Sequence, residues 1–445
     1  MSSVNWIVEK LLLPLGDFTL GRTVSKNLNF LLKSQWWSSS DLKLFQDEKL
    51  RGLVIHAYNN VPYYNELFKE NKLHPKDIHS IEDLPKLPIL TKEIIKKNFP
   101  HKISARNIKK NKQMLLCSSG STGEPLMYSS TRGAYSFKMA TNLRGLYWHG
   151  FRLGDRHCKF STNPRQAINK KFQDIITRCK YISSQGVTQE DIVKNVQELI
   201  EYKPKMIYGY PSTLSILAEY IGKNNIKELN PLFINTHGEI LFPYMREMIE
   251  QNFYCPVYDA YSGEGGAVSF QCDSSEAYHI ADEYAITEIV NDGETIIDKG
   301  RGEIISTDLW NYATPMIRYN IKDIGIIKKE TCNCKKGLST MHKIEGRDSD
   351  MLITPSGKYL IVHFFTGYFE WIHQVDQFQV IQNKTDEIEL YIKANNKYSK
   401  SIQEKIIKDV QEYIGEDIQL QLKIVDNIPL TKSGKRRFMI RNIFI

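Results

Sequence analysis

The sequence predicts an α/β fold for most of the chain, followed by a small α+β lobe. Past about residue 110, short apolar runs alternate with amphipathic helical stretches, an order typical of layered α/β structures. The last hundred residues instead follow the order β-β-α-β. The charged stretch EGRDSD (345–350), which has no periodicity, separates the two parts. We therefore place a large domain at residues 1–347 and a small one at 348–445.

The composition is that of a folded chain and excludes disorder. Of 445 residues, 41% are hydrophobic and 11% aromatic, which is enough apolar surface for a large core. Lys and Arg exceed Asp and Glu by 59 − 51 = 8, a mild positive balance at this length. It fits anionic small molecules, a membrane surface or nucleic acid equally well, so it selects none of them.

The sequence gives no sign of membrane insertion or of secretion. No apolar run reaches the roughly 18 residues that a membrane helix needs. The apolar patch near the start is broken by Glu9, Lys10 and Pro14, and it lacks a basic start and a small-residue cleavage site. Seven cysteines at irregular spacing argue against a disulfide framework. We expect a cytoplasmic protein, with peripheral membrane contact left open.

The individual elements follow from hydrophobic periodicity. Within 40–75 a helical pattern stops before Pro62, and it forms part of a helical lead-in over about 1–110. The stretch 191–202 places apolar residues on one helical face. Four short apolar runs are expected to be buried strands: 114–119, 205–210, 232–239 and 256–262.

The last part of the chain contains two expected strands, 377–382 and 387–394, with a turn between them. A helix follows over 401–415, which we expect to begin with a capping box formed by Ser401 and Glu404. Residues 418–425 alternate with period two and predict a half-exposed strand.

The stretch SSGSTGEP (118–125) is a candidate phosphate-binding loop. Glycines let backbone amides approach an anion, and hydroxyl groups add donors for phosphate oxygens. It is not a Walker loop, because no lysine follows the glycine. A flexible Ser/Gly turn is the alternative on composition alone.

Several segments in a fixed order resemble those of the adenylate-forming (acyl-AMP) superfamily, and most closely its phenylacetate–CoA ligase-like family in the CapK-like polysaccharide-biosynthesis branch. The resemblance spans nearly the whole chain. Its segments are VPYY (61–64), LPKLPILTK (84–92), SSGSTGEP, INTHGEIL (234–241), VYDAYSGEGG (257–266), RYNIKDIG (318–325), EGRDSDML (345–352) and PLTKSGKRRF (429–438).

The resemblance implies a large domain of layered sheets and helices that binds ATP and the acyl substrate. A small mobile domain then carries the catalytic Lys435 and turns about a hinge near Ser349. The resemblance also implies that Glu264 holds magnesium. The remaining ATP- and AMP-binding residues that it implies are Ser118, Ser119, Gly120, Ser121, Thr122, Gly123, Gly238, Glu239, Asp259, Ala260, Tyr261, Asp323 and Arg347.

Acyl adenylation requires this kind of residue set. The reaction joins a carboxylate to the α-phosphate and expels pyrophosphate, so two anions must be held together. This demand is met by a loop that binds phosphate, a divalent metal, and a cation on a mobile segment that reaches the site during the reaction. From the residues alone, other interpretations stay open. They are a solvated loop acid for Glu264, a turn residue for Asp323 and a solvated basic tail for Lys435.

The sequence departs from the family pattern in three places. Tyr261 and Glu264 are one residue closer than usual, and the threonine between them is absent. Ser349 stands where Asp or Lys is common, a change that a hinge tolerates. Residues 353–361 match the thioester-forming pattern poorly, which questions the use of CoA more than adenylation.

A second constellation combines Cys272, His279, Cys332 and Cys334. Three sulfurs and one imidazole make a closed set for structural zinc, and some members of the family have such a pair of pairs. Four unrelated residues are the alternative. We interpret Cys117, Cys158, Cys179 and Cys255 as core fillers or incidental thiols.

The acyl pocket is expected between the 118–125 loop, the strand end at 205–212 and residues 236–239. His237, Tyr208, Tyr210 and Trp148 are its candidate lining residues. Aromatic residues at strand ends are more often core, and this alternative stays open.

The sequence therefore predicts an AMP-forming acid–thiol or acid–amine ligase that uses ATP, Mg²⁺ and structural Zn²⁺. Its partners are a small-molecule carboxylate and an acceptor, which is CoA, a carrier thiol or an amine on a sugar-linked precursor. The CapK-like resemblance alone points to surface-polysaccharide biosynthesis. A catalytically inactive homologue that acts as a nucleotide-binding scaffold is the rival, and specific nucleic-acid binding is not expected.

Overall fold

The computed structural model divides the chain into two compact units, residues 1–345 and 346–445. The division lies two residues from the boundary expected from the sequence. The described residues are 2–117, 126–161, 168–183, 189–296, 298–328, 332–347, 351–355, 359–361, 365, 368–369, 372, 374–429 and 437–443.

The first hundred residues form a helical lead-in, as predicted. The pattern over 40–75 resolves into two helices, because Val61 interrupts the first and Pro62 opens the second at a position where proline needs no amide donor. The helices are α1 (Ser3–Ile7), η1 (Val8–Leu12), α2 (Leu13–Leu20), α3 (Val24–Ser34), α4 (Ser39–Asn60), α5 (Pro62–Glu70), η2 (Pro75–Asp77), η3 (Ile81–Lys86), α6 (Lys92–Asn98) and η4 (Lys110–Lys112).

An eight-stranded sheet forms the centre of the large unit, in the order β14-β9-β8-β7-β6-β5-β3-β4. The strands β4, β3, β5, β6 and β7 run parallel to one another, whereas β8, β9 and β14 are antiparallel additions. The strands are β3 (His157–Ser161), β4 (Cys179–Ser183), β5 (Met206–Gly209), β6 (Phe233–His237), β7 (Val257–Ser262), β8 (Val268–Cys272), β9 (Ser275–Ile280) and β14 (Thr340–Met341).

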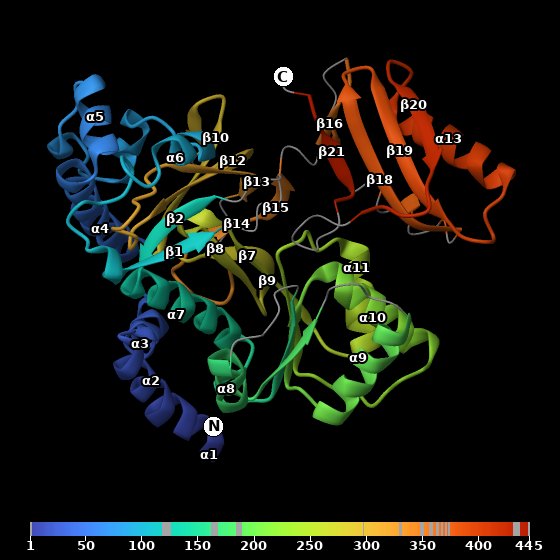
Figure 1. Cartoon of the computed structure of the whole chain (residues 1–445), viewed down its shortest axis with the longest axis horizontal. Helices are drawn as coiled ribbons and strands as arrows, with labels where there is room; N and C mark the ends of the chain where they lie inside the picture. Colours follow the sequence, from blue (N-terminus) through green and yellow to red (C-terminus); the bar gives the residue numbers. More distant parts are fainter. Residues whose placement is uncertain are drawn as a thin grey trace. The chain divides into compact units, whose positions relative to one another are not determined.

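Helices cover both faces of this sheet. Helices α9, α10 and α11 lie together (Figure 1), and their residues Leu199, Leu217 and Ile249 share a core with Ile234 of β6. On the other face, Phe137 of α7 packs in one cluster with residues of α3 and the sheet. The covering helices are α7 (Arg132–Trp148), α8 (Ile168–Thr177), α9 (Gln189–Tyr202), α10 (Pro211–Lys223) and α11 (Pro243–Phe253).

A second, antiparallel sheet has the order β11-β10-β12-β13-β15. Its apolar face packs on the lead-in helices, where Ile95 of α6 and Leu90 join Ile304 in one core cluster. The strands are β10 (Ala285–Asn291), β11 (Glu294–Ile296), β12 (Lys299–Asp308), β13 (Tyr319–Lys328) and β15 (Lys343–Arg347).

The strands β1 (Gln113–Cys117) and β2 (Met127–Thr131) form a separate two-stranded hairpin. We expected a buried strand over 114–119, and this expectation is wrong: Leu115 is 60% exposed, and Cys117 is exposed. The reason is that β1 pairs only with β2 and with neither of the large sheets. Apolar composition alone did not distinguish such a hairpin from a core strand.

The small unit contains a four-stranded sheet, β20-β19-β18-β21, and helix α13 lies against it (Figure 1). The predicted β-β-α-β order is confirmed, but the capping box at Ser401 is wrong. Ser399 caps the helix instead, because its hydroxyl accepts a hydrogen bond from the Ile402 amide. The elements are β16 (Met351–Ile353), β17 (Tyr359–Ile361), β18 (Val375–Lys384), β19 (Glu387–Ala394), α13 (Lys400–Ile414), β20 (Gln419–Ile424) and β21 (Met439–Arg441).

Among the described residues, no helix combines the length and the apolar character needed to cross a membrane.

Candidate functional site

Three parallel strands of the large sheet end at one edge. The register pairs Gly209 of β5 with Thr236 of β6, and His237 of β6 with Ala260 of β7. The segments that follow these strands therefore lie next to one another. In parallel sheets the carboxyl edge is where ligands bind, because the connecting loops can present side chains there.

Three aromatic rings gather at this edge. The ring of His237 contacts Tyr208 edge-on at 4.0 Å between centroids and lies 4.9 Å from the ring of Tyr210. The sequence predicted these three residues together, and the structure brings them together at the end of β5 and β6. Their role as the lining of an acyl pocket stays a prediction.

Glu239 lies just beyond β6, and its carboxylate accepts a hydrogen bond from the Ser212 amide at 3.1 Å. Ser212 belongs to the first turn of α10, where backbone amides lack helical partners and favour negative charge. Gly238, with φ of +73°, makes the turn that brings Glu239 there. The Gly-Glu pair thus shapes this edge of the sheet.

Tyr261 and Asp323 join the two sheets. Tyr261 is near the end of β7, and its hydroxyl donates a hydrogen bond to Asp323 Oδ2 at 2.6 Å. Asp323 belongs to β13 of the five-stranded sheet. These are the residues expected to contact the adenine and the ribose, and the structure places their side chains next to each other. Their roles stay predictions.

A bulge in β13 sets the direction of the Asp323 side chain. The β12–β13 ladder pairs Ile305 with Asn320 and Glu303 with Ile324, so β13 carries extra residues between these pairs. Lys322, with φ of +68°, lies within the bulge. Bulges change the direction of side chains. This one accounts for the position of Asp323, which departs from the regular alternation of side chains along the strand.

Asp259 was predicted to take part in nucleotide binding, and the structure places its side chain in the interior. Tyr278 donates a hydrogen bond to its carboxylate at 2.6 Å, and Thr236 donates another. Burial raises the pKa of Asp259 to about 6. Its carboxylate therefore ties β7 to β6 and β9, whereas the neighbouring Ala260 contributes backbone to the strand.

Glu264 lies two residues past β7 and is half-buried. Within the described part of the chain, its carboxylate takes part in no hydrogen bond or ion pair. Gly265 and Gly266 follow with positive φ, and a Cβ on Gly266 would lie 3.2 Å from the Asp308 backbone. The glycines let the chain turn tightly directly after Glu264.

The hairpin β1–β2 brings together the described residues on either side of 118–125, because its register pairs Cys117 with Met127. The pKa of the next residue, Tyr128, is raised by burial and then by the negative charge of Glu264. Glu264 therefore lies near Tyr128, which is three residues past the predicted phosphate-binding segment in the sequence.

Several predicted residues lie outside the described residues, namely Lys435 and the loop residues Ser118 to Gly123. Arg347 ends β15, but its side chain also lies outside the description.

Trp148 is the last residue of α7, and its ring packs edge-on against His279 at 5.6 Å and against Phe270 at 6.1 Å. Packing of that helix on β8 and β9 decides its position. An aromatic ring at the end of an element can serve a pocket or a core, so the role of Trp148 in the acyl pocket stays a prediction.

Cys272, His279, Cys332 and Cys334 form one cluster, and their candidate ligand atoms all lie within 4.8 Å of one another. The Sγ atoms of Cys272 and Cys332 are 3.5 Å apart, and Cys334 Sγ lies 3.3 Å from His279 Nε2. The four residues come from β8, β9 and the segment between β13 and β14. Strand pairing of Thr340 with His279 returns that segment to the sheet.

The donor set and its spacing fit tetrahedral zinc. Zinc lies about 2.3 Å from sulfur and about 2.0 Å from nitrogen, so ligand atoms should be roughly 3.5–3.8 Å apart. The two distances above are close to this range. Burial lowers the pKa of His279 to about 4, which keeps the imidazole in the neutral form that binds a metal. With four protein donors, no position stays open for a substrate.

Gly337 holds the segment that carries Cys332 and Cys334 against the end of α3. It was not among the residues predicted from the sequence. Its amide donates to the Gln35 carbonyl at 3.0 Å, and a Cβ at this position would lie 1.8 Å from the Trp37 carbonyl oxygen. Only glycine allows this approach. The glycine that ends TCNCKKG was the available signal.

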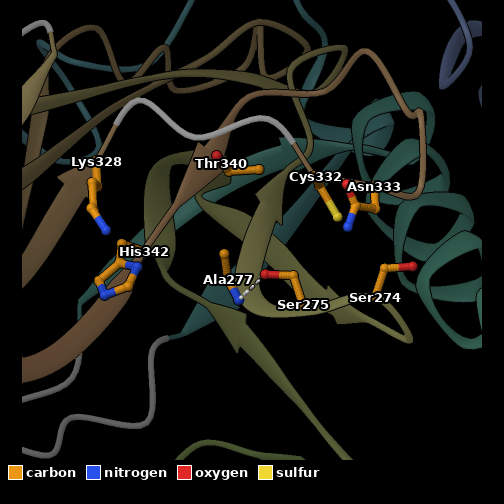
Figure 2. A pocket seen from close by; sticks show the side chains of 8 residues that line it. All are labelled: Ser274, Ser275, Ala277, Lys328, Cys332, Asn333, Thr340 and His342. Atoms are coloured by element: carbon orange, nitrogen blue, oxygen red, sulfur yellow. Dashed lines mark hydrogen bonds between the residues drawn. The ribbon is translucent and has the colours of Figure 1, made fainter.

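A surface pocket adjoins the cluster through Cys332 (Figure 2). Figure 2 shows Lys328 and His342 at one end of it and Cys332 and Asn333 at the other. Of the described residues predicted to bind nucleotide, none lines this pocket. It therefore belongs to the surroundings of the cysteines and not to the edge formed by β5, β6 and β7.

Replacing Cys334 with serine is expected to reduce bound zinc from about one ion per chain to a small fraction, because a hydroxyl is a poor substitute for a thiolate. Thermal stability should fall, whereas turnover per folded molecule should stay nearly unchanged. Metal analysis of the purified protein, with Cys179→Ser as control, measures this. Cys179 belongs to β4, at the opposite edge of the sheet. Absence of zinc from the unmodified protein would end the zinc assignment.

Sequence comparisons agree with this architecture. A profile described as the CapK C-terminal domain matches residues 352–442. Protein CapK of Staphylococcus aureus is 26% identical over 413 residues, which cover 91% of this chain and 90% of that protein. A phenylacetate–coenzyme A ligase of Pseudomonas putida is 26% identical over 406 residues, which cover 86% and 90%.

A solved structure of 2-hydroxyisobutyryl-CoA ligase superposes with a TM-score of 0.73 at 17% identity and covers 91% of this chain and 90% of that one. At this identity the likeness shows a shared fold. Fold and relatives together define an adenylate-forming protein. In sequence, the chain is similar to CapK and to phenylacetate–CoA ligases, and its C-terminal region matches the CapK C-terminal domain.

Proposed function

We propose that the protein is an ATP-dependent, AMP-forming carboxylate ligase. The observation that carries this proposal is the 2.6 Å contact between Tyr261 and Asp323, which unites two sheets beside Glu264. The Pseudomonas putida relative is a phenylacetate–coenzyme A ligase, and the solved structure with the same fold is in complex with 2-HIB-AMP, in a postadenylation state. Both support an activity that passes through an acyl-adenylate.

In the first half-reaction, an oxygen of the substrate carboxylate attacks the α-phosphorus of ATP. The bond from that phosphorus to the bridging oxygen breaks, and pyrophosphate leaves with the bonding electrons. Tyr261 is proposed to stack on the adenine, and Asp323 to accept hydrogen bonds from the ribose hydroxyls. The 118–125 loop would hold the phosphates with amides and hydroxyls.

Glu264 is proposed as the protein ligand of the magnesium ion that accompanies ATP, and the ion neutralises phosphate charge when bound. One half-buried carboxylate with no other described partner suits Mg²⁺, which prefers to share its coordination with substrate phosphates and water. Lys435 is proposed to contact the carboxylate and the α-phosphate during adenylation, and Arg347 the ribose.

In the second half-reaction, the acyl group passes to a nucleophile and AMP leaves. We propose that the small unit turns near Ser349, withdraws Lys435 and admits CoA, a carrier thiol or an amine. The similarity to CapK supports an acceptor linked to surface-polysaccharide precursors. Tyr208, Tyr210 and His237 are the residues we propose to line the acyl pocket.

A catalytically inactive, nucleotide-binding scaffold is the second candidate. The short spacing between Tyr261 and Glu264 motivates it, because a displaced metal ligand would stop adenylation while nucleotide binding persisted. Glu264 argues against it, since a scaffold has no chemical need for a half-buried acid that has no hydrogen-bond or ion-pair partner among the described residues.

Exchange of labelled pyrophosphate into ATP, with a panel of carboxylic acids, tests the proposed function. Exchange occurs only if an acyl-adenylate forms reversibly, and mass spectrometry of the product then identifies the acid. We expect exchange with at least one acid of the panel. ATP binding without exchange for any acid would favour the scaffold.

Glu264→Gln is expected to raise the magnesium concentration needed for half-maximal exchange by roughly tenfold or more, about 1.4 kcal/mol of binding free energy. The amide keeps the shape of the side chain and removes the charge that attracts the ion. A magnesium titration of exchange measures this, with Glu294→Gln on the exposed strand β11 as control. An unchanged magnesium response would assign the ion to another residue.

A further inference from the structure

The first helices of the chain present an apolar surface to solvent. Of the nineteen large apolar side chains that are exposed in the described structure, eight lie within residues 4–20. Scattered exposed apolar residues are ordinary, but a concentration of this kind marks an interaction surface. The eight, with their exposed fractions, are Val4 (40%), Trp6 (51%), Ile7 (44%), Leu11 (52%), Leu12 (38%), Leu15 (59%), Phe18 (86%) and Leu20 (50%).

The arrangement of this segment is the reverse of an ordinary surface helix, which turns its apolar face inward. Val4, Ile7, Leu11, Leu15 and Phe18 follow one another at intervals of three or four residues, the spacing of one helical face. That face is the exposed one. We call these five residues the outward stripe.

Polar side chains hold the opposite face to the protein. The side-chain amide of Asn5, 4% exposed, donates to the Leu153 carbonyl and to Asp155, each at 3.0 Å. Glu9 accepts a hydrogen bond from the Tyr147 hydroxyl. Buried Asp17 accepts from the Ser25 amide at 2.7 Å. The segment is therefore held in place with its apolar side chains pointing outward.

Backbone packing reinforces this hold. Gly154 has φ of +93°, and a Cβ there would lie 3.2 Å from both the Asn5 Cα and the Val4 carbonyl oxygen. Val8 is 5% exposed and belongs to the core cluster of α3 and α7. A segment fixed so closely cannot roll over to bury the outward stripe without losing these contacts.

The exposed charged side chains of residues 2–40 have one sign. Residues 2–40 contain two acids, and both point toward the protein in the contacts given above. The exposed charged side chains are basic: Lys10, Lys26 and Lys33. Arg132 of α7 adds another, since its guanidinium lies beside Gly21. A segment that combines an exposed apolar stripe with exposed basic groups has the pattern that binds anionic bilayers, where acyl chains receive the apolar residues and headgroups receive the cations.

We propose that residues 4–20 dock the protein on the surface of an anionic phospholipid bilayer, with the outward stripe inserted at the level of the headgroups. A second copy of the chain fits less well, because a two-fold contact through this face would bring like charges together. The proposal places the enzyme at a membrane surface and is independent of the chemistry proposed above.

Flotation of the full chain with phosphatidylcholine vesicles, with and without phosphatidylglycerol, tests the proposal. We expect binding to the anionic vesicles, weaker binding to the neutral ones, and a loss on raising the salt concentration. The variant Leu11→Ser/Leu15→Ser/Phe18→Ser should bind at least tenfold less. Its matched control, Leu44→Ser/Ile175→Ser/Leu232→Ser, removes three side chains that are 67%, 73% and 48% exposed elsewhere and should bind normally.

A charge variant, Lys10→Glu/Lys26→Glu/Lys33→Glu, should lose the preference for phosphatidylglycerol and retain the weak binding to neutral vesicles. Circular dichroism checks that every variant is folded. Equal binding by the stripe variant and its control would overturn the proposal. So would a dimer that the stripe variant abolishes, because a second copy would then cover the stripe.

Discussion

Lys435→Ala is expected to lower the rate of acyl-adenylate formation by about 10²–10³-fold, the usual cost of removing one group that stabilises developing charge. The ammonium is proposed to meet the carboxylate and the α-phosphate together, at the moment when negative charge spreads over the phosphate oxygens. Pyrophosphate exchange measures this half-reaction alone. Transfer from chemically supplied acyl-AMP, which no longer needs the lysine, should be affected much less.

Lys432→Ala provides the matched control, because it removes the same charge from the same segment three residues earlier. It should leave both half-reactions close to normal. Equal loss of adenylation and transfer in Lys435→Ala would contradict the proposed role. It would indicate instead that the substitution disturbs the small unit as a whole.

The fold followed from the sequence where hydrophobic periodicity was unambiguous. The strands at 206–209, 233–237 and 257–262, and the helix over 189–202, lie where the apolar runs predicted them. The exposure of the hairpin strand β1 could not be predicted in this way, because an apolar run does not reveal how many neighbours a strand will have. Ser399 caps the last helix two residues before the predicted cap, because either serine can supply the hydroxyl.

The cluster of Cys272, His279, Cys332 and Cys334 shows how much residue types alone can predict. Three cysteines and a histidine predicted a set of zinc ligands, and the structure brings their ligand atoms together. The pairing of β14 with β9, and the close approach of Gly337 to Trp37, determine that assembly. Both depend on contacts between distant segments, which local spacing does not contain.

The residues at the edge formed by β5, β6 and β7 also differ in how well the sequence predicted their positions. The positions of Glu239 and Tyr261 follow from strand ends in a parallel sheet, which a sequence pattern can locate. The orientation of Asp323 depends on a bulge, and that of Asp259 on a partner, Tyr278, two strands away. A carboxylate at a strand end can therefore serve a ligand or the core, and only its partners decide which.

Arg144→Met is expected to destabilise the large unit by about 3–5 kcal/mol, because it leaves the charge of Glu283 buried without its partner. Arg144 Nη1 and Glu283 Oε1 are 2.7 Å apart, and both side chains are 0% exposed. The Ser34 hydroxyl also donates to Glu283, at 2.6 Å. These contacts thus tie α3 and α7 to the segment between β9, the strand that carries His279, and β10. Urea unfolding measures the loss.

The control is Lys102→Met, which breaks an ion pair of similar length, 2.9 Å, between side chains that are 55% and 53% exposed. Its effect should stay below about 1 kcal/mol, because water solvates the remaining Glu66. The double replacement Arg144→Met/Glu283→Leu should recover much of the stability, since it removes the buried charge together with its partner. If Arg144→Met cost no more than Lys102→Met, Glu283 would have to be protonated or reached by water. The pair would then not hold α7 against the sheet.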